Sequence, residues 1–115
     1  MLVVDDEYII ATDLRQGLAE RGATVIGPVP SVEKAIVLIL SGTHLDGAIL
    51  DVNLQGQMVF PVADLLLERS VPFLFMTGYD QSVIPERFKA IVRCEKPLQL
   101  EVLCRTMTGI LARDT

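Results

Sequence analysis

The sequence predicts an α/β domain built on a doubly wound parallel sheet, and two observations support this fold class. Short apolar runs alternate with helical patterns along the whole chain, and runs of this length are typical of parallel strands that are buried on both faces. Polar residues follow four of these runs, and ligands bind outside the carboxyl ends of the strands in open parallel sheets. We therefore predict five βα units in one domain over residues 1–115, with a polar site at one edge of the sheet.

Strands are expected where the apolar runs lie, at residues 2–4, 23–27, 47–51, 71–76 and 90–94. Pro28 and Pro30 are expected to close the second of these strands, because proline cannot donate to a strand ladder. The four residues around Gly56 have the composition of a turn and lack the pattern of a phosphate-binding loop.

Helices are expected between the strands. Apolar residues recur every four positions in the first of them, at Ile10, Leu14 and Leu18. Ser31 is expected to cap a second helix that runs to about residue 40, and Pro61 to open a third that runs to about residue 69. The last helix is expected from about residue 98 to residue 112. Pro85 interrupts the segment 79–89, so the fourth helix is expected to be a short turn or an irregular loop.

Composition excludes several classes of function. The 115 residues carry 10 basic and 15 acidic side chains and no basic run, which argues against direct binding of nucleic acid. The longest apolar stretch, residues 35–40, is too short to cross a bilayer, and we find no signal peptide or lipidation motif. We therefore expect a cytoplasmic domain that does not insert into membranes, with Cys94 and Cys104 as free thiols.

Three carboxylates at strand ends predict a metal site. Asp5 and Asp6 follow the first strand and Asp51 ends the third, so all three are expected at the same edge of the sheet. Two adjacent acids could also serve the first helix, whose N-terminus favours negative charge. Three clustered carboxylates, however, repel one another strongly unless a cation lies between them. A set of hard oxygen ligands favours Mg²⁺.

The remaining polar residues at strand ends fit phosphoryl chemistry. Asp51 is the candidate nucleophile, since a carboxylate can attack a phosphoryl group and form an acyl phosphate. Thr77 could donate its hydroxyl to a phosphoryl oxygen, and Lys96 could pair with the phosphate as a point charge. Each of these two residues has an ordinary explanation as well: threonine is common in strands, and lysine is common before a turn.

Four motifs in order resemble the receiver domain of two-component response regulators: Val3-Val4-Asp5-Asp6-Glu7, Leu50-Asp51-Val52-Asn53, Met76-Thr77-Gly78 and Lys96-Pro97-Leu98. The resemblance covers essentially the whole chain and implies a flavodoxin-like strand order, 2-1-3-4-5. It implies that Asp51 accepts phosphate from a kinase phosphohistidine. It also implies that Asp6, Asp51 and the backbone carbonyl of Asn53 ligate Mg²⁺, with Asp5 acting through water. Thr77 and Lys96 would contact the phosphoryl group, and the Lys96-Pro97 bond would be cis.

A finer resemblance concerns the string Pro72-Phe73-Leu74-Phe75-Met76-Thr77-Gly78-Tyr79, which is similar to the motif of the FAT GUY subgroup of receivers. Such receivers act alone or within hybrid sensor kinases, often beside kinases of the HWE/HisKA2 class in alphaproteobacterial general stress signalling. Typical receivers carry an aromatic residue three positions before the lysine, where this chain has Arg93. We therefore hypothesise that the loop 79–89 is reordered on phosphorylation, with Tyr79 and Arg93 as candidate switch residues.

The resemblance thus implies a bacterial phosphoacceptor receiver that catalyses only its own phosphorylation and dephosphorylation. The expected partners are a sensor histidine kinase or a phosphotransfer protein, and the choices between stand-alone regulator and hybrid-kinase receiver, and between monomer and homodimer, stay open. One alternative is a pseudo-receiver that binds partners without phosphorylation. Another is a Mg²⁺-dependent aspartyl-phosphate hydrolase of the haloacid dehalogenase type, which would need a second acid where this chain has Asn53.

Overall fold

The computed structural model describes residues 1–54, 56–78, 83–96 and 99–113. Its centre is a five-stranded parallel sheet in the order β2-β1-β3-β6-β7. The strands are β1 (Leu2–Val4), β2 (Ile26–Val29), β3 (Ala48–Asp51), β6 (Phe73–Thr77) and β7 (Arg93–Glu95). When only the five strands of this sheet are numbered in chain order, their spatial order is 2-1-3-4-5, so the predicted fold class is confirmed.

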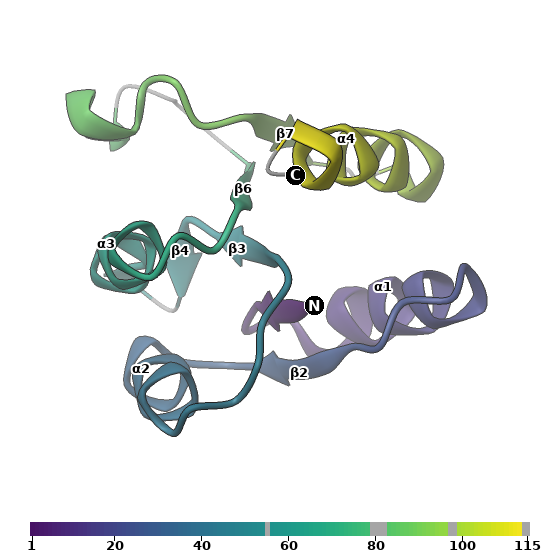
Figure 1. Ribbon diagram of the computed structural model, residues 1–115, viewed down its shortest axis with the longest axis horizontal. Coiled ribbons are helices and arrows are strands. Elements are labelled where there is room, and N and C mark those ends of the chain that lie inside the picture. Colours follow the sequence, from purple (N-terminus) through teal and green to yellow (C-terminus); the bar gives the residue numbers. More distant parts are fainter. Residues whose placement is uncertain (55, 79–82, 97–98, 114–115) are drawn as a thin grey trace.

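Two layers of helices cover the sheet (Figure 1). The helices α1 (Tyr8–Glu20) and α4 (Leu100–Arg113) lie on one face, and α2 (Val32–Leu40) and α3 (Phe60–Glu68) lie on the other. The hydroxyl of Ser31 accepts the backbone N–H of Lys34 at 3.2 Å and caps α2 as predicted. Among the described helices, none has both the length and the apolar character that a membrane span requires.

The second strand lies later in the chain than predicted. It continues through Pro28 to Val29, whereas the prediction closed it at Gly27. Two features allow this: β2 is an edge strand, where proline is tolerated, and its register with β1 shifts between Leu2 and Val4. Gly27 has a φ of 107°, and a Cβ there would lie 2.6 Å from the carbonyl oxygen of Val3, so no other residue fits this close approach.

The last strand also begins later than the predicted residue 90. The backbone N–H of Ile91 donates to the carbonyl of Phe88 at 3.0 Å, so this stretch is still part of a turn. Pairing with β6 begins at Arg93, opposite Phe75. Ala90 is exposed and Ile91 and Val92 are half-buried, so the apolar composition of residues 90–92 does not mark an extended strand.

Between β6 and β7 the described residues contain the 3₁₀ turn η2 (Glu86–Phe88) and no α-helix, which agrees with the prediction of a short or irregular fourth helix. The predicted turn around Gly56 connects two short antiparallel strands, β4 (Asn53–Leu54) and β5 (Gln57–Met58), which the sequence did not suggest. Tyr79 and the Lys96-Pro97 bond lie outside the described residues, so the predictions about them are untested.

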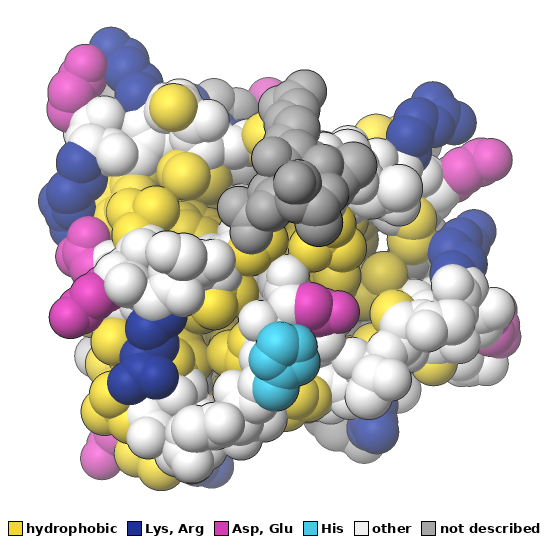
Figure 2. All heavy atoms as spheres, viewed as in Figure 1, with side chains coloured by type: hydrophobic (Ala, Val, Ile, Leu, Met, Phe, Trp, Pro, Cys, Tyr) yellow, Lys and Arg dark blue, Asp and Glu magenta, His cyan; other side chains and the backbone are white. Residues whose placement is uncertain are grey.

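The core differs between the two faces of the sheet. Under α2 and α3, four phenylalanine rings form one aromatic cluster: Phe60, Phe73, Phe75 and Phe88. Under α1 and α4 the core is aliphatic and includes three methionines, with both free thiols, Cys94 and Cys104, packed at its margin. Figure 2 shows that, on the face it presents, Lys and Arg side chains are dispersed among acidic ones. This agrees with the absence of a basic run in the sequence.

Candidate functional site

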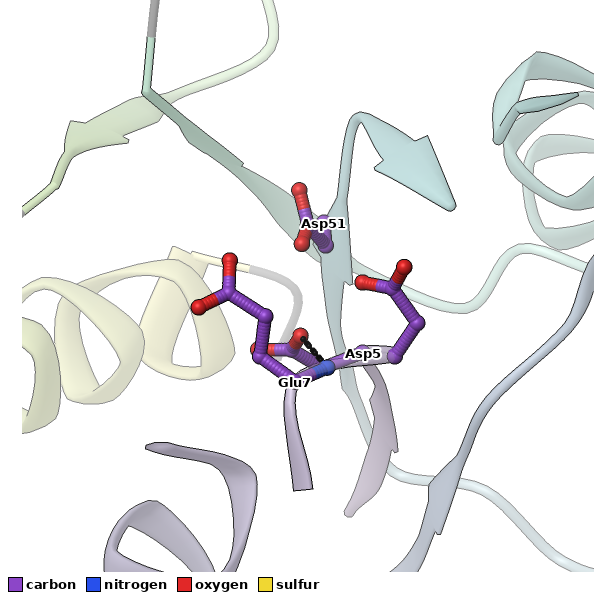
Figure 3. Close-up of side chains that lie close together, drawn as sticks. Asp5, Glu7 and Asp51 are labelled. Atoms are coloured by element: carbon purple, nitrogen blue, oxygen red, sulfur yellow. Dashed lines mark hydrogen bonds between the residues drawn. The ribbon is translucent and has the colours of Figure 1, made fainter. Parts of the chain in front are cut away.

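The predicted polar residues meet at the carboxyl ends of the strands. Asp5, Asp6 and Glu7 follow β1, and Asp51 ends the adjacent strand β3. One carboxylate oxygen from each of these four residues lies within 4.8 Å of the others. Figure 3 shows that the carboxylates of Asp5, Glu7 and Asp51 gather around one space at this edge of the sheet.

Asp5 is the most constrained of these acids. It is 2 % exposed, and its Oδ1 accepts the backbone N–H of Glu7 at 2.9 Å, which fixes the carboxylate at the start of α1. Its Oδ2 is buried and has no hydrogen-bond partner among the described residues. Burial raises the pKa of Asp5 to about 6, and the charge of Asp51 adds to this, against the opposing hydrogen bond from Glu7.

Asp51 is held from two sides. Its Oδ2 accepts a hydrogen bond from Lys96 Nζ at 2.9 Å, and its Oδ1 accepts the backbone N–H of Asn53 at 3.3 Å. The residue is 4 % exposed. Hydrogen bonds to a carboxylate orient it without forming a covalent bond to it, so both oxygens of Asp51 are held in fixed directions at this edge of the sheet.

Lys96 reaches the site because β7 pairs with β6. Its backbone N–H donates to the carbonyl of Thr77 at 2.8 Å, which extends the strand pairing by one residue and directs the side chain to the acids. The ammonium contacts Asp51 at 2.9 Å and Glu7 at 3.2 Å. Burial lowers the pKa of Lys96, but the hydrogen bonds and charges of these carboxylates outweigh it, and the pKa is raised overall.

Thr77 lies at the end of β6 and is 5 % exposed. Its hydroxyl oxygen is buried and makes no hydrogen bond with the residues that the structure describes. A buried hydroxyl without a partner destabilises a fold, and such groups in native proteins call for an explanation. A ligand with acceptor oxygens at this edge of the sheet would supply the missing partner.

The donor set fits a hard divalent cation. Four carboxylates lie together, the Lys96 ammonium contacts two of them, and the buried Oδ2 of Asp5 has no partner among the described residues. Oxygen ligands with this excess of negative charge suit Mg²⁺. Asn53 opens β4 two residues beyond Asp51, and its backbone N–H donates to Asp51 Oδ1, so the two residues lie next to each other at this edge of the sheet.

Sequence reasoning placed Glu7 in a motif but gave it no role, whereas the structure shows its carboxylate in the site. Its position directly after two acids was the available signal. Arg93 lies in β7 and is half-buried, with its Nε shielded from solvent. The other switch candidate, Tyr79, lies outside the described residues.

Comparison with known proteins gives a consistent result. No protein-family model matches the chain, and no curated protein is significantly similar to it. The solution structure of SdrG from Sphingomonas melonis Fr1 is 34 % identical, with a TM-score of 0.82 over 96 % of this chain and 93 % of that one. A BeF3-activated conformation of SdrG, from Pseudomonas melonis Fr1, has the same identity and coverage and a TM-score of 0.78.

A response regulator receiver protein from Sinorhizobium medicae WSM419 shares the fold, with a TM-score of 0.86 at 24 % identity over 99 % of this chain and 94 % of that one. The identity and coverage of the match to SdrG exceed what a shared fold alone would give. The strand order, the acidic site and these matches agree with one another. The chain belongs to the response regulator receiver domains.

Proposed function

We propose that this domain is the phosphoacceptor of a two-component phosphorelay and that Asp51 takes the phosphoryl group from a phosphohistidine of a kinase. One observation carries the proposal: the buried carboxylate of Asp51 is bonded to Lys96, at the strand edge where Thr77 and Asp5 keep buried oxygens without partners among the described residues. Such an arrangement adds nothing to packing, and it supplies a nucleophile and a cation.

The transfer would proceed by in-line displacement at phosphorus. A carboxylate oxygen of Asp51 forms the new P–O bond while the P–N bond to the histidine breaks, and the imidazole leaves with the electron pair. The Lys96 ammonium neutralises charge on the phosphoryl oxygens, and the Thr77 hydroxyl donates to one of them. Hydrolysis of the acyl phosphate later restores the carboxylate, so the domain would act catalytically only on its own phosphorylation state.

Asp5, Asp6, Asp51 and the backbone carbonyl of Asn53 would hold Mg²⁺. When bound, the ion offsets the negative charge that gathers between carboxylate and phosphoryl oxygens during transfer. The residues alone leave an excess of negative charge at the site, since Lys96 is the one cation that contacts these acids among the described side chains.

A specific contact disfavours the hydrolase alternative. Haloacid dehalogenase-type enzymes need an acid two residues beyond the nucleophile, and this chain has Asn53 there. The Asn53 Oδ1 accepts the backbone N–H of Gly56 at 2.7 Å, so the side chain stabilises the β4–β5 turn. A carboxamide does not titrate in the range that general acid or base catalysis needs, so Asn53 cannot replace the missing acid.

The finer assignment rests on the string from Pro72 to Tyr79, which is similar to the FAT GUY motif. It suggests a bacterial cytoplasmic receiver served by a kinase of the HWE/HisKA2 class, acting alone or in a hybrid kinase. The BeF3-activated conformation of SdrG supports activation by a phosphoryl-like group. Reordering of the loop 79–89, with Tyr79 and Arg93 as switch residues, would then transmit the signal.

Phosphorylation by small donors tests the proposal. Wild type, Asp51→Asn and the matched surface control Asp13→Asn are incubated with Mg²⁺ and acetyl phosphate or phosphoramidate, and their intact masses are compared. We expect one phosphoryl group on wild type and on the control, and none on Asp51→Asn. If wild type stays unmodified even with a phosphorylated HWE-class kinase as donor, the pseudo-receiver alternative is correct.

A further inference from the structure

Glu7 makes a contact that its place in the helix does not require. It is the N-cap residue of α1, yet its side chain makes no capping hydrogen bond. Glutamate is not among the residues preferred at this position, which are chiefly Ser, Thr, Asp and Asn. Its carboxylate instead contacts the Lys96 ammonium at 3.2 Å, across 89 residues of sequence. The contact therefore serves the site more than it serves the helix.

The ammonium of Lys96 is shared between two carboxylates of unequal exposure. The Asp51 side chain is 6 % exposed and the Glu7 side chain is 51 % exposed, with Lys96 itself at 18 %. An ammonium has three N–H donors, so one donor stays available when one is directed to Asp51 and one to Glu7. That third donor is the one an incoming phosphoryl oxygen needs.

The contact of Lys96 with both Glu7 and Asp51 also changes the electrostatic environment of the Asp51 carboxylate. A lysine paired with a single carboxylate competes with any cation for that carboxylate, and the competition is strong where water is partly excluded. The Glu7 carboxylate offsets part of the positive potential that the ammonium exerts on Asp51, and it adds its own negative charge near the other acids. Both effects favour a divalent cation at Asp51.

We propose that Glu7 is a positioning residue that holds the Lys96 ammonium between itself and Asp51, so that Asp51 stays available to Mg²⁺ and to the phosphoryl group. The inference rests on the proposed function and extends it to a residue for which the sequence gave no role. Glu7 does not react in this scheme, because it acts through Lys96 and through its charge.

Three variants distinguish the effect of the Glu7 charge from the effect of its side-chain length. Glu7→Gln removes the charge, and Glu7→Asp keeps the charge but is one methylene too short to make the 3.2 Å contact without a shift. Glu68→Gln is the matched control, because it removes the same charge from an exposed position at the far end of α3. The Mg²⁺ dissociation constant is measured by amide chemical shifts, and the Lys96 ammonium is followed by its own ¹⁵N resonance.

We expect Glu7→Gln to raise the Mg²⁺ dissociation constant by roughly three- to tenfold and to shift the Lys96 ammonium resonance. Glu7→Asp should raise the constant less and should also shift the resonance, whereas Glu68→Gln should match wild type in both. The inference is wrong if Glu7→Gln matches the control, or if Glu7→Asp is indistinguishable from wild type. Wild type that binds no Mg²⁺ would overturn the proposed function as well, whereas phosphorylation of Asp51 with no effect of Glu7 would overturn this inference alone.

Discussion

The acid site, formed by Asp5, Asp6, Glu7 and Asp51 with Thr77 and Lys96, and the aromatic cluster contact the same sheet. The two regions differ in how completely their buried groups are paired. In the aromatic cluster the rings of Phe60, Phe75 and Phe88 contact one another at centroid distances of 5.6–6.0 Å, and Phe75 and Phe88 are fully buried. In the acid site two buried oxygens, on Asp5 and Thr77, have no partner among the described residues. One region gains stability from every contact, and the other leaves polar groups unpaired.

The difference indicates which residues serve the fold and which serve function. Buried aromatic side chains contribute through apolar area and ring geometry. Buried polar groups without partners lower stability, and a protein that keeps them does so for another purpose. Substitutions in the two regions should therefore change the free energy of unfolding in opposite directions.

The largest expected effect is in the aromatic cluster. Phe88→Ala should lower the free energy of unfolding by about 3–5 kcal/mol, because it removes a fully buried ring next to Phe60 and Phe75. Urea denaturation measures the loss. Phe88→Leu should cost less and serves as the milder variant if the alanine protein does not fold. A loss below about 1 kcal/mol for alanine would show that η2 does not depend on this ring.

In the absence of metal, Asp5→Asn should raise the free energy of unfolding, whereas Phe88→Ala should lower it. The folded-state pKa of Asp5 is about 6 and its usual value is 3.8, so its favourable contribution is complete below pH 3.8 and is lost as the pH rises through 6. Asparagine does not ionise, and we expect it to stabilise the fold by about 1–3 kcal/mol at neutral pH and by progressively less toward pH 4.

Thermal and urea unfolding across this pH range, with Asp13→Asn as the surface control, measure the Asp5 effect. Saturating Mg²⁺ should reduce or reverse it, because a ligand that binds only the folded wild type stabilises that protein. A stabilisation of Asp5→Asn that does not vary with pH would contradict the assignment of the effect to ionisation.

The smallest expected effect concerns Thr77. Valine has nearly the same shape as threonine and removes the buried hydroxyl, so Thr77→Val should change stability by about 0 to 1 kcal/mol in the favourable direction. The acetyl phosphate reaction should slow, since the hydroxyl would no longer donate to the phosphoryl group. A loss of more than about 1 kcal/mol in urea unfolding would indicate that the hydroxyl has a structural partner.

Much of the fold and the site could be predicted from local pattern. The strands β1, β3 and β6 lie within a residue or two of their predicted bounds, because each is a short apolar run that the sheet buries on both faces. Asp5, Asp51, Thr77 and Lys96 could be placed together because the carboxyl ends of parallel strands share one edge. Their roles in phosphoryl transfer stay predictions.

The two edge strands show where local pattern fails. The bounds of β2 depend on the close approach of Gly27 to Val3, and the start of β7 depends on the turn that joins Ile91 to Phe88. The first is a contact between segments distant in the sequence, whereas the second is a local turn that takes the place of the first residues of the predicted strand. A short apolar run does not by itself distinguish an extended strand from a turn, so the start of β7 could not be predicted from composition.

By itself, the sequence determined the fold class, the order of its elements and the edge at which the acids gather, because these follow from periodicity and from the geometry of parallel sheets. Only the tertiary structure decided that Lys96 is shared between Asp51 and Glu7, and that Asp5 and Thr77 keep buried oxygens without partners among the described residues. The physical reason is that hydrogen bonding and desolvation depend on which side chains from separate strands come within about 3 Å of each other, and no pattern along one segment encodes that distance.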